Sequence, residues 1–141
     1  MTRTLLITGC SSGIGHAAAQ HMRARGWRVF ASCRSQADCD RMQAAGFDSP
    51  RIDYTDATSI HEGLGAVLAT TGGTLDALLN NGAHGLPGAV EDLATAGLRD
   101  IFESNVFGWH ELTRQVLPVM RAQGHGRIVQ NSSILGFVSF P

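Results

Sequence analysis

Thr8-Gly9-Cys10-Ser11-Ser12-Gly13-Ile14-Gly15 is the stretch of sequence that decides the fold. The apolar run before it, Leu5–Ile7, predicts a strand, and the apolar positions after it recur at helical spacing. A helix that begins directly after a glycine-rich turn offers unpaired N–H groups and a partial positive charge to an anion. Glycines let the backbone approach a phosphate without a Cβ in the way. The stretch therefore predicts a binding place for the pyrophosphate of a dinucleotide.

Strand-like and helix-like segments alternate along the rest of the chain. We predict strands over 4–8, 27–32, 51–54, 75–80 and 127–131, and helices over 14–25, over 36–45, from Asp56 to the Gly72-Gly73 pair, and over about 91–123. Strands separated by helices form parallel sheets with right-handed crossovers. The pattern predicts a single α/β domain over residues 1–141. Its fold is a Rossmann-like, doubly wound parallel sheet in three layers, with strand order 3-2-1-4-5 and truncation after the fifth strand.

The composition excludes several classes of protein. The net charge is −1 and the basic residues form no block, so a nucleic-acid partner is not expected. No apolar run is long enough to span a membrane, and the start of the chain reads into a strand and not into a signal peptide. Cys10, Cys33 and Cys39 form no C-x-x-C pair, so we expect free thiols, a reducing cytoplasmic location and no metal site.

Four motifs in sequence order resemble the short-chain dehydrogenase/reductase family over nearly all of the chain. They are the turn Thr8–Gly15 with its Gly-x-x-x-Gly-x-Gly spacing, Asn80-Asn81-Gly82-Ala83 after the predicted fourth strand, Asn105 in the long helix, and Ser132-Ser133-Ile134-Leu135-Gly136 after the fifth strand. One glycine-rich turn alone is a weak signal, whereas four motifs in register are specific. The family's Asn-Asn-Ala-Gly has its last two residues exchanged here.

The resemblance implies a nicotinamide cofactor held by residues from several segments. Asp53 matches the position whose side chain meets the adenine amino group, and the Tyr54 N–H would meet a ring nitrogen. The remaining predicted contacts are Gly9, Cys10, Ser11, Ser12, Gly13, Ile14 and Gly15 in the turn and Asn81, Gly82 and Ala83 after the fourth strand.

Arg34 decides the predicted cofactor preference. NAD enzymes place a carboxylate about 20 residues past the turn to bind the ribose hydroxyls, but Ala31-Ser32-Cys33-Arg34 has no carboxylate. The guanidinium of Arg34 suits the extra phosphate of NADP, so we favour NADP over NAD. The alternative is that Arg34 is a solvated loop residue.

The resemblance also implies hydride transfer between the nicotinamide and a carbonyl or alcohol carbon of a small molecule. Ser133 matches the serine that hydrogen-bonds the substrate oxygen, and Asn105 matches the asparagine that holds a water for proton relay. An asparagine in mid-helix can also open the helix and mark a kink. His84 follows the second motif, where we favour a solvated loop residue over a substrate contact.

The family's Tyr-x-x-x-Lys motif, which provides the acid/base tyrosine and its lysine, has no counterpart here. Tyr54 is the one tyrosine, and no lysine occurs among the 141 residues. We therefore expect a truncated, inactive chain of a protein that forms homodimers or homotetramers, with Ile101, Phe102 and Leu112, or their neighbours, on an exposed apolar face. The alternatives are a non-catalytic dinucleotide-binding or interaction module, and a methyltransferase or other Rossmann-like binder, which would leave Asn105 and Ser133 unexplained.

Overall fold

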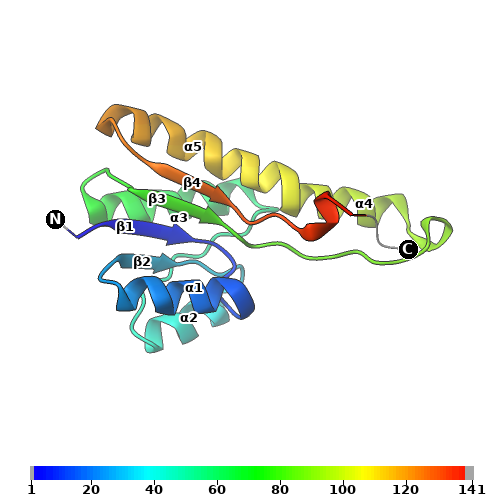
Figure 1. The fold of residues 1–141 in the computed structure, drawn as a ribbon, viewed down its shortest axis with the longest axis horizontal. Helices are drawn as coiled ribbons and strands as arrows, with labels where there is room; N and C mark the ends of the chain where they lie inside the picture. Colours follow the sequence, from blue (N-terminus) through cyan, green and yellow to red (C-terminus); the bar gives the residue numbers. More distant parts are fainter. Residues whose placement is uncertain (1, 139–141) are drawn as a thin grey trace.

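The computed structural model describes residues 2–138, which form a parallel four-stranded sheet with helices on both faces (Figure 1). The strands are β1 (Thr4–Ile7), β2 (Arg28–Ala31), β3 (Ala77–Asn80) and β4 (Arg127–Gln130), and their order in the sheet is β2-β1-β3-β4. The chain passes from β2 over β1 to reach β3, so the strand order reverses between β1 and β3. The predicted Rossmann-like parallel sheet is confirmed.

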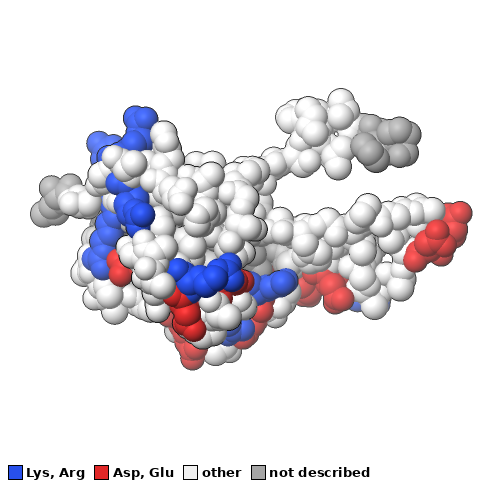
Figure 2. All heavy atoms as spheres, turned by 90° about the horizontal axis from the view of Figure 1, so that it is seen from below, with Lys and Arg blue, Asp and Glu red and all other residues white. Residues whose placement is uncertain are grey.

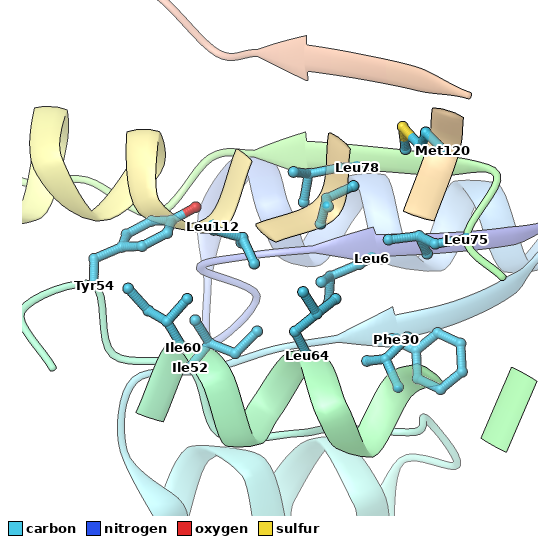
Figure 3. Packing of buried hydrophobic residues seen from close by; sticks show 12 residues of the cluster. Leu6, Phe30, Ile52, Tyr54, Ile60, Leu64, Leu75, Leu78, Leu112 and Met120 are labelled. Carbon is cyan, nitrogen blue, oxygen red and sulfur yellow. The ribbon is translucent and has the colours of Figure 1, made fainter. Parts of the chain in front are cut away.

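Alternate residues of the strands build two separate cores. Leu6, Phe30 and Leu78 face α3 (Ala57–Thr71) and α5 (Gly108–Gln123) in the cluster that Figure 3 shows. Their neighbours Leu5, Ile7 and Val29 face α1 (Gly13–Ala24) and α2 (Gln36–Ala44). Because both faces of the sheet are covered, the strands read as nearly continuous apolar runs.

The predicted third strand, 51–54, is wrong. The segment runs parallel to β2, but only two isolated bridges join them, Phe30 to Asp48 and Cys33 to Arg51. A regular ladder would have the N–H of residue 50 donate to the Ala31 carbonyl, and Pro50 has no N–H. The Ser49 hydroxyl donates to that carbonyl instead, at 2.6 Å. One proline therefore reduces the expected strand to an extended segment beside the sheet.

The predicted long helix over 91–123 is also wrong. A 3₁₀ turn (Val90–Asp92) is followed by α4 (Thr95–Phe102), a π-helical turn (Glu103–Phe107) and then α5, which continues through Pro118. Asn105 lies at the centre of the π turn, where the second of its two interpretations placed a break in the helix. A π turn leaves backbone groups out of the regular ladder and is frequent at functional sites.

The side of the molecule that carries β4 and α4 is open. Exposed apolar side chains gather there: Leu98, Phe102, Val106, Phe107, Val129, Ile134 and Phe137. The expectation for Leu112 is wrong, because Leu112 is fully buried between α5 and the sheet. Figure 2 shows the segment with α4 and the segment after β4 as two arms that leave the body separately.

Candidate functional site

A cleft of about 420 Å³ lies at the carboxyl ends of the strands. The segments that follow β2, β1, β3 and β4 enter it in the same order as their strands lie in the sheet. Open parallel sheets bind ligands at this edge, where the strand order reverses. The lining residues are Thr8, Gly9, Ser11, Ser12, Ile14, Arg34, Asp38, Ile52, Asp53, Tyr54, Thr55, Asn81, Gly82, Ala83, His84, Ser104 and Asn131.

The glycine-rich turn has the shape that an anion site needs. Gly9 and Gly13 have left-handed φ angles of +68° and +59°, which side chains disfavour. A Cβ on Gly15 would lie 2.3 Å from the Gly9 carbonyl oxygen, so α1 packs directly against the turn. The first turn of α1 has no acidic residue, and the Ser12 side chain does not cap it. Its positive end is therefore available to a phosphate, and the residues present fit a dinucleotide.

Cys10 anchors the turn to the core through its buried side chain and its backbone N–H. Its side chain is fully buried in the core under α1 and α2, and its N–H donates to the Ser32 carbonyl at 2.9 Å. Burial raises the pKa of the Cys10 thiol well above its usual range. Among residues 2–138, the three cysteines are free thiols, and no group of three metal-ligating side chains is close enough to hold an ion.

Asn81 fastens the ends of three strands together. Its side-chain amide donates to the carbonyls of Thr8 and Gly9 at 3.0 and 3.3 Å, and its Oδ1 accepts from Asn131 at 2.8 Å. Sequence reasoning placed Asn81 beside the cofactor, and the structure shows that its side chain serves the scaffold. Asn131 was missed, because only its position after β4 marks it.

A buried hydroxyl network lies behind the turn. The Tyr54 hydroxyl donates to Asn80 Oδ1 at 2.6 Å, so the Thr8 hydroxyl, also at 2.6 Å, must donate to Tyr54. The Thr8 oxygen then accepts the N–H groups of Asn81 and Gly82 at 3.0 and 3.3 Å. Burial raises the pKa of Tyr54 far above its ordinary value. Tyr54 therefore stays neutral and acts as a scaffold residue, not as an acid or base.

The end of the cleft beside β2 carries the charged groups. Arg34 and Asp38 line it, and Asp38 is paired with Arg41. Ser35 and Arg41 lower the pKa of the Asp38 carboxyl by hydrogen bonding. Asp53 is held by Thr55 and lies 3.7 Å from Arg51.

The other end of the cleft is built by the π turn. Asn105 accepts the His84 N–H through Oδ1 at 3.2 Å and donates through Nδ2 to the His84 carbonyl at 2.7 Å. Ser104 lies beside it and contacts the His84 ring nitrogen Nδ1 at 3.1 Å. Trp109, one turn later, donates to the Gly82 carbonyl at 2.7 Å. Ser104 and Trp109 were missed because no motif marks them.

Ser133 lies outside the cleft lining. It begins a 3₁₀ turn (Ile134–Gly136), where its hydroxyl oxygen accepts the Leu135 N–H at 3.1 Å. Ser133 lies in the segment after β4 and Asn105 in the π turn after α4, and no hydrogen bond joins the two residues within 2–138. Their predicted catalytic roles stay predictions.

Comparison with known proteins is consistent with this geometry. The family model for short chain dehydrogenases matches residues 3–141. The uncharacterized oxidoreductase YbbO of Escherichia coli K12 is 38% identical over 141 residues, which are 100% of this chain and 52% of that protein. Human retinol dehydrogenase 8 is 34% identical over 95% of this chain and 45% of its own length. The chain spans about half the length of these curated relatives.

Solved structures share the fold. A short-chain dehydrogenase from Streptomyces avermitilis superposes with a TM-score of 0.90 at 38% identity, covering 99% of this chain and 52% of that one. An actinorhodin polyketide ketoreductase solved with NADPH superposes with a TM-score of 0.89 at 30% identity, over 99% and 56% of the two chains. Within residues 2–138, no helix is long and apolar enough to cross a membrane.

Proposed function

Because this chain belongs to the short-chain dehydrogenase/reductase family, we propose that it forms the cofactor-binding part of an NADP-dependent oxidoreductase. Such an enzyme transfers a hydride between the nicotinamide and a carbonyl or alcohol carbon of a small-molecule substrate. The turn Thr8–Gly15 would hold the pyrophosphate at the start of α1. Asp53 and the Tyr54 N–H would meet the adenine, and Gly82 and Ala83 would lie along the nicotinamide.

Arg34 is the observation that carries the preference for NADP. It lines the cleft directly after β2, where NAD enzymes place a carboxylate. The nearest carboxylate in the lining on α2, Asp38, is neutralised by its ion pair with Arg41. The charge left at this end of the cleft suits a phosphate on the ribose. The related ketoreductase that was solved with NADPH supports the same preference.

The proposed chemistry divides between this chain and residues outside it. In our proposal, Ser133 donates a hydrogen bond to the substrate oxygen, and Asn105 holds the loop after β3 and a relay water. The acid/base tyrosine and its lysine must come from outside these 141 residues, because Tyr54 is buried and neutral and the chain has no lysine. We further propose a cytoplasmic homodimer or homotetramer, supported by three reduced, buried cysteines and by the exposed apolar side chains on α4 and β4.

Cofactor titration of an Arg34→Ala variant tests the proposal. Loss of one charged hydrogen bond to a phosphate weakens NADPH binding by roughly ten- to hundredfold, and NADH binding stays within about twofold. Arg25→Ala is the matched control, because Arg25 lies just before β2 at the opposite edge of the sheet. Binding is measured by the quenching of tryptophan fluorescence. An equal loss for both cofactors, or a wild-type preference for NADH, would contradict NADP as the cofactor.

The second candidate is a dinucleotide-binding module without catalysis, which the neutral, buried state of Tyr54 and the lack of lysine favour. It predicts that the natural protein binds NADPH tightly but oxidises none of it with a panel of aldehydes and ketones. Turnover that is lost in Ser133→Ala would exclude this candidate.

A further inference from the structure

His84 is held as a fixed part of the cleft wall, although the sequence favours a solvated loop residue. Both backbone groups of His84 are bonded by the Asn105 amide, which fixes the direction in which the side chain leaves the loop. The ring contacts Ser104 through Nδ1 at 3.1 Å. His84 and Ser104 both line the cleft, at the end opposite Arg34.

The contacts of Ser104 indicate which ring nitrogen of His84 carries the hydrogen in the neutral imidazole. The Ser104 oxygen lies 2.9 Å from Asn105 Oδ1 and 3.3 Å from the Ile101 carbonyl, and both of these are acceptors. Asn105 cannot be turned over, because its Oδ1 faces the His84 N–H and its Nδ2 faces the His84 carbonyl. Ser104 has one hydrogen, and we assign it to Asn105 Oδ1, the nearest of its three hydrogen-bond partners at 2.9 Å. The Ser104 oxygen therefore accepts from His84, so Nδ1 carries the hydrogen.

The other ring nitrogen of His84 is consequently an acceptor. With Nδ1 protonated, the neutral ring presents a lone pair on Nε2, on the ring edge away from Ser104. No hydrogen bond to Nε2 occurs within the part of the chain that the structure describes. An acceptor held rigidly in a cleft wall recognises a hydrogen-bond donor, and a hydroxyl group is the donor that small carbonyl compounds commonly carry.

We propose that His84 Nε2 contacts the substrate and selects compounds that carry a hydroxyl group beside the reacting carbonyl. Ser104 and Asn105 are positioning residues in this assignment, because they set the tautomer and the direction of the ring. The inference rests on the proposed function, in which Gly82 and Ala83 would lie along the nicotinamide and His84, next in the same loop, would face the substrate. The contact with His84 Nε2 gives the site a preference for hydroxyaldehydes and hydroxyketones over plain aldehydes and ketones of the same size.

Nitrogen NMR on the complete ¹⁵N-labelled protein tests the tautomer without any need for turnover. In the wild type, the neutral His84 ring shows a protonated Nδ1 and an unprotonated Nε2. Ser104→Ala removes the acceptor for Nδ1–H, so the two tautomers of His84 mix. Ser132→Ala is the matched control, because it changes a serine in the segment after β4 and leaves the Ser104–His84 pair in place. A wild-type ring with its hydrogen on Nε2 would overturn the inference.

Competition between two aldehydes tests the selectivity. With NADPH, the wild type reduces glyceraldehyde with a higher kcat/KM than propanal. His84→Phe lowers the ratio of kcat/KM for glyceraldehyde to kcat/KM for propanal by roughly three- to tenfold, as expected for one lost hydrogen bond. His84→Gln, which restores an acceptor, recovers part of the loss, and His61→Phe on α3 is the control without effect.

The outcomes separate this inference from the proposed function. Equal losses for both aldehydes in His84→Phe, in a protein that turns over NADPH, overturn the inference and leave the function standing. If neither aldehyde is reduced, the function fails, and the NMR experiment then decides the inference alone. In that case the Nε2 resonance must shift with glyceraldehyde and stay in place with propanal.

Discussion

The two sides of the sheet differ in how completely they are built. On the side of β1 and β2, the turn Thr8–Gly15, α1 and α2 enclose a core in which Ile7, Cys10 and Ala31 are fully buried. On the side of β4, the strand itself is exposed, and α4 has no buried residue. In the proposed function, the first side binds the cofactor and the second side carries the residues that take part in the reaction. In that proposal the cofactor seat is formed by closely packed residues, whereas the substrate side is formed by exposed segments.

The largest expected effect on stability comes from adding a side chain where α1 packs directly against the turn Thr8–Gly15. Gly15→Ala places a Cβ 2.3 Å from the Gly9 carbonyl oxygen, far inside van der Waals contact. We expect about 3 kcal/mol of lost stability and no measurable NADPH binding, since overpacking against backbone cannot relax by side-chain rotation. Urea unfolding and cofactor titration measure the two effects.

Gly65→Ala is the matched control for this experiment, because α3 has open space at Gly65. Alanine is the better helix former, so this variant should be as stable as the wild type or slightly more stable. If Gly15→Ala binds NADPH normally, the tight packing of helix against turn is not what forms the cofactor seat.

A smaller effect is expected where the two sides meet, at Tyr54. Tyr54→Phe keeps the ring but removes the hydroxyl, which leaves Asn80 Oδ1 and the Thr8 hydroxyl without their buried partner. The expected cost is about 2 kcal/mol of unfolding free energy. Thr58→Val, at an exposed position where only the backbone N–H is hydrogen-bonded, serves as the control. A cost below about 0.5 kcal/mol for Tyr54→Phe would show that water replaces the hydroxyl.

Asp76 joins the two sides at the opposite edge of the sheet and makes stability depend on pH. Burial alone would raise its pKa, but hydrogen bonds from the Thr4 N–H and hydroxyl and from His125 outweigh burial and lower it. A carboxyl whose pKa is lowered on folding stabilises the protein above its unfolded pKa, and this contribution is lost as pH falls through the folded value.

The free energy of unfolding of Asp76→Asn should therefore fall less steeply than that of the wild type below about pH 4. At pH 7 the variant should be less stable by about 1 kcal/mol. Thermal unfolding between pH 3 and pH 7 measures the difference, and Asp92→Asn in the exposed 3₁₀ turn is the control. Parallel curves of stability against pH for Asp76→Asn and the wild type would exclude Asp76 as the source of the pH dependence.

The same contrast explains how far the sequence could predict the structure. The turn, the strands and the buried faces follow from local patterns, because glycine spacing and apolar periodicity are set by neighbouring residues. The cause of the missing strand at 51–54 is also local, because Pro50 lacks the N–H for one hydrogen bond of the ladder. Whether this loss is enough to prevent a strand could be judged only once the segment was seen beside β2. Leu112 was expected to be exposed for lack of a neighbouring helix, but α5 turns it toward α3 and the sheet, a packing contact that no local pattern reports.

The candidate site was predictable in outline but not in its hydrogen bonds. The motifs indicated Asn81 and Asn105 as residues of the site, and both lie at or beside the cleft, whereas His84, for which the sequence favoured a solvated loop residue, also lines it. Their actual partners come from segments 20 to 70 positions away, which no local pattern reports. Tyr54 shows this most clearly, because its hydroxyl reaches Thr8 and Asn80 across the core.

The smallest effect on stability is expected on the open side, at Phe107. This side chain is 53% exposed and packs mainly on Phe102, at 6.3 Å between ring centres. Phe107→Ser should lower the free energy of unfolding by only about 1 kcal/mol, because about half of the side chain already lies in water. It should nevertheless reduce self-association in analytical ultracentrifugation, since it removes part of the exposed apolar face. Phe30→Ser, at a buried position, is the contrasting variant and should unfold the chain. If Phe107→Ser destabilised the protein as strongly as a core substitution, α4 and the π turn would belong to the closed, self-sufficient part of the molecule, and the distinction between the two sides would be lost.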